Sequence, residues 1–196
     1  VNSFGRQRVL VCQTCLGKPP CSSENRTATE LWSLGGGDMK PKVYIETTIP
    51  SYLTAWPSRD LVTAAHQQIT REWWQTRRQD FDLFTAQLVI DEASKGDPDA
   101  ATRRLEVLKD IPLLEPSEDV AELARTLIEQ IPFPERATDD AIHIAMAVVS
   151  GMDYLLTWNC AHIANAARRG AIESVCQSRG YEVPIICTPE ELLEEE

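Results

Sequence analysis

Short apolar segments alternate with helical segments from residue 43 to residue 187, and this alternation limits the fold more than any other feature of the sequence. Runs of three to five apolar residues bounded by polar or turn residues are typical of buried strands. We predict strands over residues 43–46, 82–85, 112–114, 154–156 and 184–187. Strands that alternate with helices indicate an α/β fold in which a parallel sheet carries helices on both faces.

The segments between these strands carry the periodicity and the capping residues of helices. We predict helices over residues 49–55, 60–78, 87–95, 99–109, 118–130, 139–149 and 165–178. Ser117 and Thr138 are candidate N-caps, and Gly96 begins the turn that ends the third helix. In the helix over 60–78, the predicted buried face consists of Leu61, Ala64, Ala65, Gln68, Ile69 and Trp73.

Residues 1–38 differ from the rest of the chain. They contain scattered glycine, serine, proline and cysteine and show no lasting periodicity. We predict that this stretch is a disordered extension or a non-native upstream segment, with Met39 as the natural start, and that residues 39–196 form the one folded domain.

Composition and charge exclude several classes of protein. The longest apolar runs fall short of the roughly 20 residues that a membrane span requires, so we expect no membrane association. The first residues lack the pattern of a signal peptide, which favours the cytoplasm. The net charge of −11 argues against a nonspecific nucleic-acid binder and suits a protein that docks a basic partner. Cys12 and Cys15 form only half of a zinc pattern, so we expect free thiols.

Polar side chains recur where the predicted strands end and the next helices begin. Glu46 follows the first strand, Glu92 lies in the helix after the second, Asp140 opens the helix after residue 138, and Asn159 follows the strand over 154–156. Taken singly, each is an ordinary surface acid, helix cap or turn residue. Together they are expected to meet at the carboxyl edge of the sheet, where sites of α/β proteins form.

Asp140 carries the sharpest signal of the four. The helix that it opens is apolar on nearly all sides through Val149, and such a helix is buried. A partly buried carboxylate is costly unless a positive charge is near, and Arg136 is the one basic residue in this stretch of sequence. A divalent cation is one source of the missing charge.

Oxygen ligands of this kind suit Mg²⁺ or Mn²⁺. The predicted set has no His-x-x-x-His or paired cysteines, which argues against zinc. The chain also lacks the Gly-rich motifs that cradle nucleotide phosphates.

Three short motifs carry a resemblance to a known family. Residues 44–53 (YIETTIPSYL), 139–145 (DDAIHIA) and 155–159 (LLTWN) resemble the signature regions of PIN-domain proteins, and in particular the VapC-like toxins of type II toxin–antitoxin pairs. The resemblance covers about residues 42–188.

This resemblance implies a three-layer α/β/α fold and a metal-dependent ribonuclease that is restrained by an antitoxin protein and forms a homodimer. It also implies that Glu46, Glu92 and Asp140 are the acids that bind Mg²⁺ or Mn²⁺, that Asn159 is the fourth ligand and that Thr157 is a supporting hydroxyl. Two positions depart from the usual pattern. The first acid is Glu instead of Asp, and the fourth position is Asn where the family often has Asp.

Other residues allow two interpretations. His143 can orient a ligand or contact RNA, or it can be a hydrogen-bonded core histidine. Trp73 and Trp74 are core or interface residues, or they stack on bases. Candidate contacts to an RNA backbone are Arg71, Arg77, Arg78, Arg103, Arg104, Arg168 and Arg169.

Two alternatives to an active ribonuclease follow from the sequence. The departures at Glu46 and Asn159 are compatible with a catalytically weak PIN-like module that binds RNA or protein. A phosphotransfer enzyme on a flavodoxin-like sheet would require a nucleophilic Asp-x-Asp at a strand exit, and the chain has none.

Overall fold

The computed structural model describes residues 39–131 and 138–193, and these residues are built around a five-stranded parallel sheet. The strand order is β3-β2-β1-β4-β5. The strands are β1 (Lys42–Ile45), β2 (Asp82–Ala86), β3 (Leu113–Leu114), β4 (Tyr154–Leu156) and β5 (Ile185–Cys187). In register, Val43 of β1 lies between Leu83 of β2 and Tyr154 of β4. The predicted α/β class with a parallel central sheet is confirmed.

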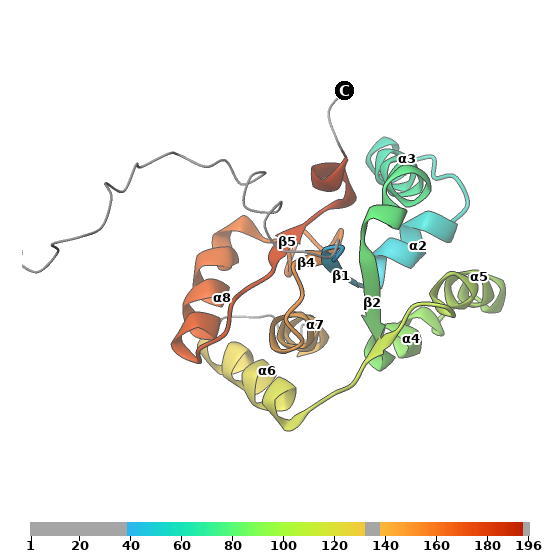
Figure 1. Ribbon diagram of the computed structural model, residues 1–196. Helices are drawn as coiled ribbons and strands as arrows, with labels where there is room; N and C mark the ends of the chain where they lie inside the picture. The colour runs from blue at the N-terminus through green and yellow to red at the C-terminus, as the bar shows by residue number, and fades with distance from the viewer. Residues whose placement is uncertain (1–38, 132–137, 194–196) are drawn as a thin grey trace, which may run out of the picture. The chain divides into compact units, whose positions relative to one another are not determined.

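Helices cover both faces of this sheet, which gives the expected three layers (Figure 1). The helices are α2 (Thr48–Thr54), α3 (Leu61–Thr76), α4 (Gln87–Ala93), α5 (Pro98–Leu108), α6 (Glu118–Gln130), α7 (Thr138–Val149) and α8 (Ala166–Ser178), with short 3₁₀ turns η2 (Arg78–Asp80) and η3 (Pro189–Leu192). Helices α6, α7 and α8 lie on one side of the strands, and α2 and α3 lie on the other. Each predicted helix is therefore present, with ends that differ by a few residues.

The connections place a topological switch point between β1 and β4. From β1 the chain crosses through α2 and α3 to β2 on one side, whereas from β4 it crosses through α8 to β5 on the other side. Since parallel crossovers are right-handed, the two connections pack their helices on opposite faces. The carboxyl ends of β1 and β4 consequently lie at this switch point, which is the usual place of the ligand site in an open α/β sheet.

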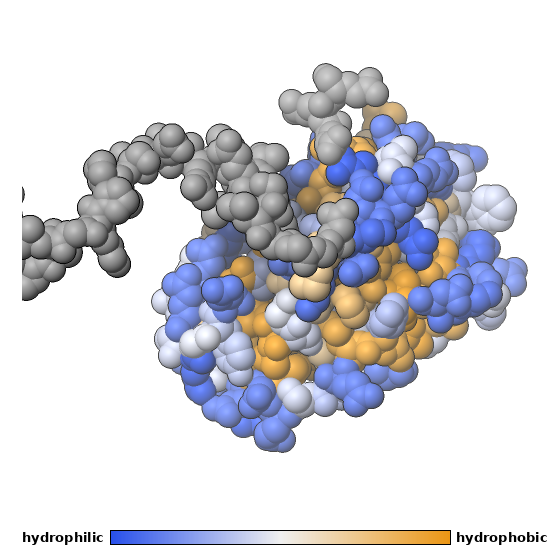
Figure 2. Space-filling model, in the orientation of Figure 1, coloured by the Kyte–Doolittle hydropathy of each residue, from blue (hydrophilic) through white to orange (hydrophobic). Residues whose placement is uncertain are grey.

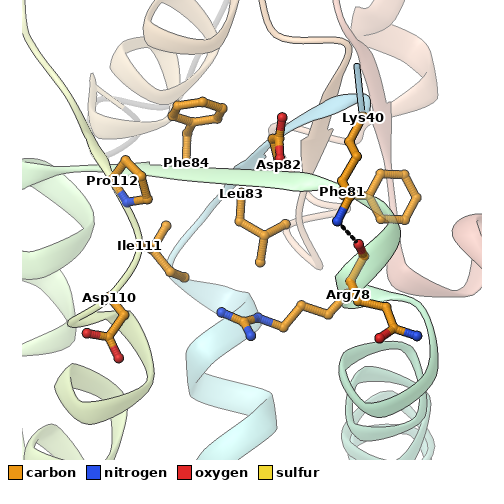
Figure 3. A pocket seen from close by; sticks show the side chains of 10 residues that line it. Lys40, Arg78, Phe81, Asp82, Leu83, Phe84, Asp110, Ile111 and Pro112 are labelled. Carbon is orange, nitrogen blue, oxygen red and sulfur yellow. Dashed lines mark hydrogen bonds between the residues drawn. The ribbon is translucent and has the colours of Figure 1, made fainter. Parts of the chain in front are cut away.

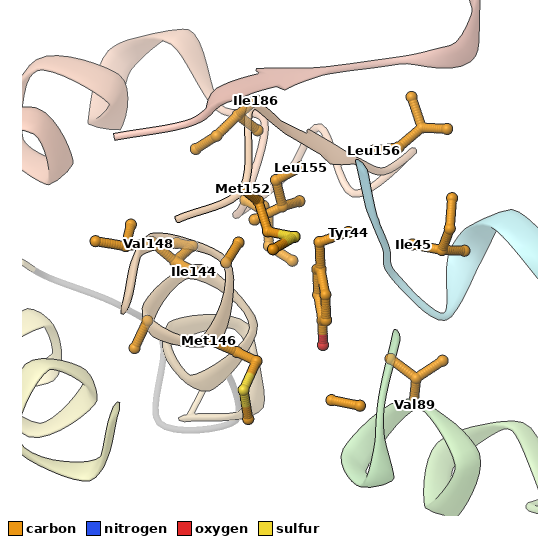
Figure 4. Close-up of a cluster of buried hydrophobic side chains, with 14 of the residues drawn as sticks. Tyr44, Ile45, Val89, Ile144, Met146, Val148, Met152, Leu155, Leu156 and Ile186 are labelled. Carbon is orange, nitrogen blue, oxygen red and sulfur yellow. The ribbon is translucent and has the colours of Figure 1, made fainter. Parts of the chain in front are cut away.

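The apolar residues of β1 and α7 form the centre of the core. Val43, Tyr44 and Ile45 are fully buried in the centre of the sheet, and Ala141, Ile144, Ala145 and Ala147 of α7 are buried against it. Figure 4 shows Tyr44 extending from β1 into the space between α7 and α4, with Ile144 and Val89 on either side. Apolar side chains also gather in the middle of the face seen in Figure 2, with hydrophilic residues around them. The prediction that α7 is a buried helix is confirmed.

The face of α3 predicted to be buried is wrong for half of its residues. Leu61, Ala65 and Gln68 are exposed, and the buried positions of α3 are Gln67, Thr70 and Trp73. The physical reason is that two of these buried residues are polar but satisfied. The Gln67 amide accepts from Ser58 N and donates to Trp56 O.

The Thr70 hydroxyl accepts a 2.7 Å hydrogen bond from Trp158 Nε1, so its burial costs little. A prediction from hydrophobicity alone therefore chose a buried face of α3 that is rotated about the helix axis from the one in the structure.

Helix caps follow the local sequence closely. Ser117 caps α6 by accepting from Val120 N, as predicted. Asn165 and Asp60 are the N-caps of α8 and α3, one residue before the helices begin, whereas the sequence placed them as first helical residues. Thr138 is the first residue of α7 and lies inside the helix, whereas the sequence predicted it as the N-cap.

Some expectations concern residues outside the described part of the chain. The prediction for residues 1–38 falls there, and so do Cys12, Cys15 and Arg136. Within residues 39–131 and 138–193, no helix has the length and apolar character needed to cross a membrane. In the same residues Cys160, Cys176 and Cys187 are free thiols.

Candidate metal centre at the carboxyl edge of the sheet

Glu46 is the residue immediately after β1, and its side chain is only 5% exposed. One carboxylate oxygen, Oε2, accepts three hydrogen bonds. They come from Thr48 N at 3.1 Å, Thr48 Oγ1 at 2.5 Å and Thr157 Oγ1 at 2.7 Å. Among the hydrogen bonds of the described residues, Oε1 of Glu46 takes none. The Glu46 carboxylate is therefore held through Oε2, and Oε1 is left without a hydrogen bond among the described residues.

Thr48 and Thr157 hold this carboxylate between β1 and β4. The Thr48 hydroxyl accepts from Trp158 N at 2.8 Å, and the Thr157 hydroxyl accepts from Asn159 N at 2.9 Å. Each hydroxyl thus donates its proton to Glu46 because the backbone after β4 occupies its acceptor side. The two strand exits that border the switch point are joined through Glu46.

Glu92 reaches the same place from α4. Its Oε2 accepts from the hydroxyl of Thr47 and lies 3.1 Å from His143 Nε2. Burial by itself raises the pKa of Glu92, but the hydrogen bonds from His143 and Thr47, together with the charge of Lys95, place the pKa below its ordinary value. Glu92 is therefore a carboxylate at neutral pH, and its Oε1 takes no hydrogen bond within the described residues.

Glu46, Glu92 and His143 form a close group. One ligand-type atom from each lies within 4.8 Å of the others. Two carboxylates at this separation repel each other unless a cation lies between or beside them. Sequence reasoning expected Glu46 and Glu92 to meet, and the structure brings them together.

Asp140 lies in the first turn of α7, beside this group and outside its 4.8 Å limit. Burial raises the pKa of Asp140 above its ordinary value. The nearby imidazoles of His162 and His143 oppose this rise in pKa, and the charges of Glu46 and Glu92 add to it. Asp140 is thus near enough to feel both glutamates, as expected for one acid cluster.

Asn159 contacts Asp140 directly. Its Nδ2 donates to Asp140 Oδ1 at 2.8 Å, and its own Oδ1 accepts from His162 N at 3.1 Å. The amide therefore orients Asp140 and keeps one lone pair of its oxygen for another partner. The five predicted site residues converge as two linked pairs and one neighbour: Glu46 with Thr157, Asp140 with Asn159, and Glu92 beside Glu46.

Sequence reasoning did not assign roles to Thr47, Thr48 and Tyr44. Thr47 and Thr48 donate to Glu92 and Glu46, and the Tyr44 hydroxyl lies 2.9 Å from His143 Nδ1. The signal was available in the run Glu-Thr-Thr after a strand, because hydroxyls next to an acid are common hydrogen-bond donors to it. His143 was left open, and it is buried and hydrogen-bonded on both ring nitrogens.

The predicted arginine contacts are spread over the molecule. Arg71, Arg103 and Arg169 donate to the main-chain oxygens of Ala55, Thr54 and Ile186. Arg168 is linked to the acid cluster through His162, because its Nη1 lies 3.0 Å from Nδ1 of His162, which lowers the pKa of Asp140.

A cavity of about 310 Å³ lies at the opposite end of the sheet, where β1 and β2 begin. Lys40, Arg78 and Asp110 surround it together with Leu83 and Ile111 (Figure 3). It is wide but contains none of the predicted metal ligands. The acid cluster at the carboxyl edge is therefore the better candidate site, because it combines buried charge with convergent hydrogen bonds.

No protein-family model and no curated protein sequence matches the chain. The structure is similar to the crystal structure of VapBC2 from Rickettsia felis bound to a DNA fragment from their promoter. The TM-score is 0.48 at 12% sequence identity, over 75% of this chain and 98% of that chain. The similarity concerns the overall fold, and the function proposed below rests on residues of this chain.

Proposed function

We propose that the protein is a metal-dependent endoribonuclease that hydrolyses RNA phosphodiester bonds. In this proposal Glu46, Glu92, Asp140 and Asn159 hold Mg²⁺ or Mn²⁺, and Thr157 supports Glu46. The observation that carries the proposal is the convergence of Glu46 and Glu92 within 4.8 Å at the switch point of the sheet.

The residues present fit a hard divalent cation. Each glutamate has one oxygen tied by hydrogen bonds and one oxygen without any among the described residues. The negative charge that collects there contributes to the raised pKa of Asp140, which a bound cation would reverse. Carboxylate and amide oxygens are the ligands that Mg²⁺ and Mn²⁺ prefer.

A divalent ion in such a site supplies an activated water and stabilises the oxygen that leaves the phosphodiester. The chain's own residues then position the substrate. Clustered carboxylates repel phosphate, so the approach requires positive groups at the rim. His162 lies close enough to Asp140 to affect its pKa, and Arg168 contacts His162, so this pair is suited to receive a phosphate of the RNA backbone.

The family resemblance of the motifs supports three further parts of the proposal. The protein is the toxin of a toxin–antitoxin pair, it forms a homodimer, and it acts in the cytoplasm. The net charge of −11 suits an antitoxin with a basic docking segment. The exposed side chains of Leu61 and Val62 at the start of α3 add an apolar surface that such a partner can cover.

The test is cleavage of a pool of structured RNAs by the full chain in Mg²⁺ or Mn²⁺. We expect cutting that EDTA abolishes and that the Asp140→Asn variant lacks, although this variant stays folded. A single-stranded DNA of the same base sequence is the matched substrate control. RNA cleavage that is equal in EDTA, or equal in the variant, would contradict the proposal. A folded protein that binds neither metal ion would instead be an interaction module.

A further inference from the structure

A buried chain of hydrogen bonds ends on Glu92. The Tyr44 hydroxyl lies 2.9 Å from His143 Nδ1, and His143 Nε2 lies 3.1 Å from Glu92 Oε2. Tyr44 is fully buried and His143 is 1% exposed. The three residues come from β1, α7 and α4, so these hydrogen bonds connect the central strand of the sheet to two helices that contribute to the candidate site.

The chemistry of the end groups fixes where the protons lie. A carboxylate can only accept hydrogen bonds, so His143 Nε2 must carry a proton and donate it to Glu92. In the tautomer with the proton on Nε2, Nδ1 is an acceptor and lies against the Tyr44 hydroxyl. A phenol keeps its proton at neutral pH, so the Tyr44 hydroxyl can donate it to Nδ1.

This arrangement leaves His143 without a lone pair for a cation. Nε2 uses its proton on Glu92, and Nδ1 accepts from Tyr44. The imidazole lies within the 4.8 Å group of ligand-type atoms, and in this tautomer it acts as a hydrogen-bond donor that restrains Glu92. Thr47 donates to the same Oε2, so two donors hold one oxygen, and Oε1 takes no hydrogen bond among the described residues.

We propose that His143, held by Tyr44, is a positioning residue that orients the Glu92 carboxylate for the metal ion. This inference rests on the proposed function, since it assigns a role to a residue that supports one of its ligands. Residues that hydrogen-bond a metal ligand fix its orientation, and their loss typically costs about 10–100-fold in metal affinity.

The first test is Mn²⁺ affinity, measured by calorimetry on the full chain without substrate. His143→Gln keeps an N–H near the position of Nε2, and we expect affinity within about threefold of wild type. His143→Leu removes the donor, and we expect affinity to fall about 10–100-fold. Thr126→Val is the matched control, because it removes a buried hydroxyl from α6, away from Glu92.

A purely structural role for His143 predicts a different pattern. Both His143 variants would then lower the melting temperature and leave the Mn²⁺ affinity at the wild-type value, as Thr126→Val should. That result, in variants shown to be folded, would overturn the inference. Loss of affinity in His143→Gln as large as in His143→Leu would also overturn it, because it would indicate direct ligation by the imidazole.

The second test separates this inference from the proposed function. Nitrogen NMR of the metal-free protein should show His143 as the Nε2–H tautomer, and Tyr44→Phe should change the Nδ1 resonance. Addition of Mg²⁺ should leave Nε2 protonated. If the protein binds metal and cuts no RNA, the proposed function fails while both tests of His143 still apply. If it binds no metal, or if Nε2 is unprotonated, the positioning role is wrong.

Discussion

At the scale of single residues, the acids Glu92 and Asp140 lie near each other, but their surroundings shift their pKa values in opposite directions. Glu92 accepts two hydrogen bonds that favour its charged form, and its pKa lies below its ordinary value. Asp140 is half-buried among other acids, and its pKa lies above its ordinary value. One carboxylate is thus stabilised by the protein itself, whereas the other is the group that most needs an external cation.

These opposite shifts predict opposite effects on stability in metal-free buffer at pH 7. Asp140→Asn should raise the free energy of unfolding, because ionised Asp140 is disfavoured in the folded state. Glu92→Gln should lower it, because the folded state stabilises ionised Glu92. Water screens both half-buried groups, so we expect each change to be about 1 kcal/mol or less. Urea unfolding measures both.

The pH dependence of the free energy of unfolding tests the predicted direction of each effect a second time. The contribution of Glu92 is present above its ordinary pKa of 4.5 and is lost as the pH falls through its lowered folded pKa. The penalty from Asp140 disappears as the pH falls through its raised folded pKa toward 3.8, so wild type and Asp140→Asn should converge. A constant difference between the two proteins from pH 7 to pH 4 would show that the charge of Asp140 is not the cause.

Arg168 carries a prediction about substrate binding. If it receives a phosphate beside Asp140, Arg168→Ala should raise the KM for RNA about tenfold and change kcat little. Arg179→Ala is the matched control, because Arg179 follows the other end of the same helix and pairs with Glu122. Steady-state cleavage at several salt concentrations measures the effect. Equal KM values for both variants would show that Arg168 does not contact the RNA substrate.

At the scale of elements, α3 shows how polar residues can set the orientation of a helix. Trp73 anchors the helix, and its ring lies 5.8 Å from that of Phe81. Towards the start of α3, Leu61 is 85% exposed, while Gln67 and Thr70 are buried through their hydrogen bonds. The start of the helix therefore adds little to the stability of the isolated chain.

This orientation predicts a large contrast between two substitutions in one helix. Trp73→Ala should lower the free energy of unfolding by about 3–5 kcal/mol, because it empties a filled core site. Leu61→Ala should change it by less than about 0.5 kcal/mol, because the side chain is already in water. Denaturant unfolding of the two variants checks the contrast. A loss above about 2 kcal/mol in Leu61→Ala would contradict this orientation of α3, because it would show that the Leu61 side chain is buried.

Element existence was predictable here because strands and helices differ in period and because turn residues separate them. The orientation of α3 was not predictable, because the partners of its polar residues lie elsewhere. Thr70 is buried only because Trp158, 88 positions later in the chain, donates to it. The buried helix α7 was predictable, because its apolar residues need no such partner.

At the scale of the whole molecule, the site exists because the strand order reverses between β1 and β4. The order β3-β2-β1-β4-β5 could not be predicted from the periodicity of the sequence, but parallel strands alone were enough to place the acids at one edge. The pattern therefore predicted which residues converge. It could not predict that Thr47 and His143 both hydrogen-bond to Oε2 of Glu92, because these long-range contacts depend on side-chain directions.

The central claim is that this acid cluster holds the cation used to cut RNA. The most direct measurement follows Mn²⁺ binding and RNA cleavage of the full chain across one Mn²⁺ titration, for wild type and Asp140→Asn. We predict that both signals rise with the same midpoint in wild type and that both are lost in the variant. Cleavage that saturates independently of Mn²⁺ binding, or that persists in Asp140→Asn, would contradict the claim.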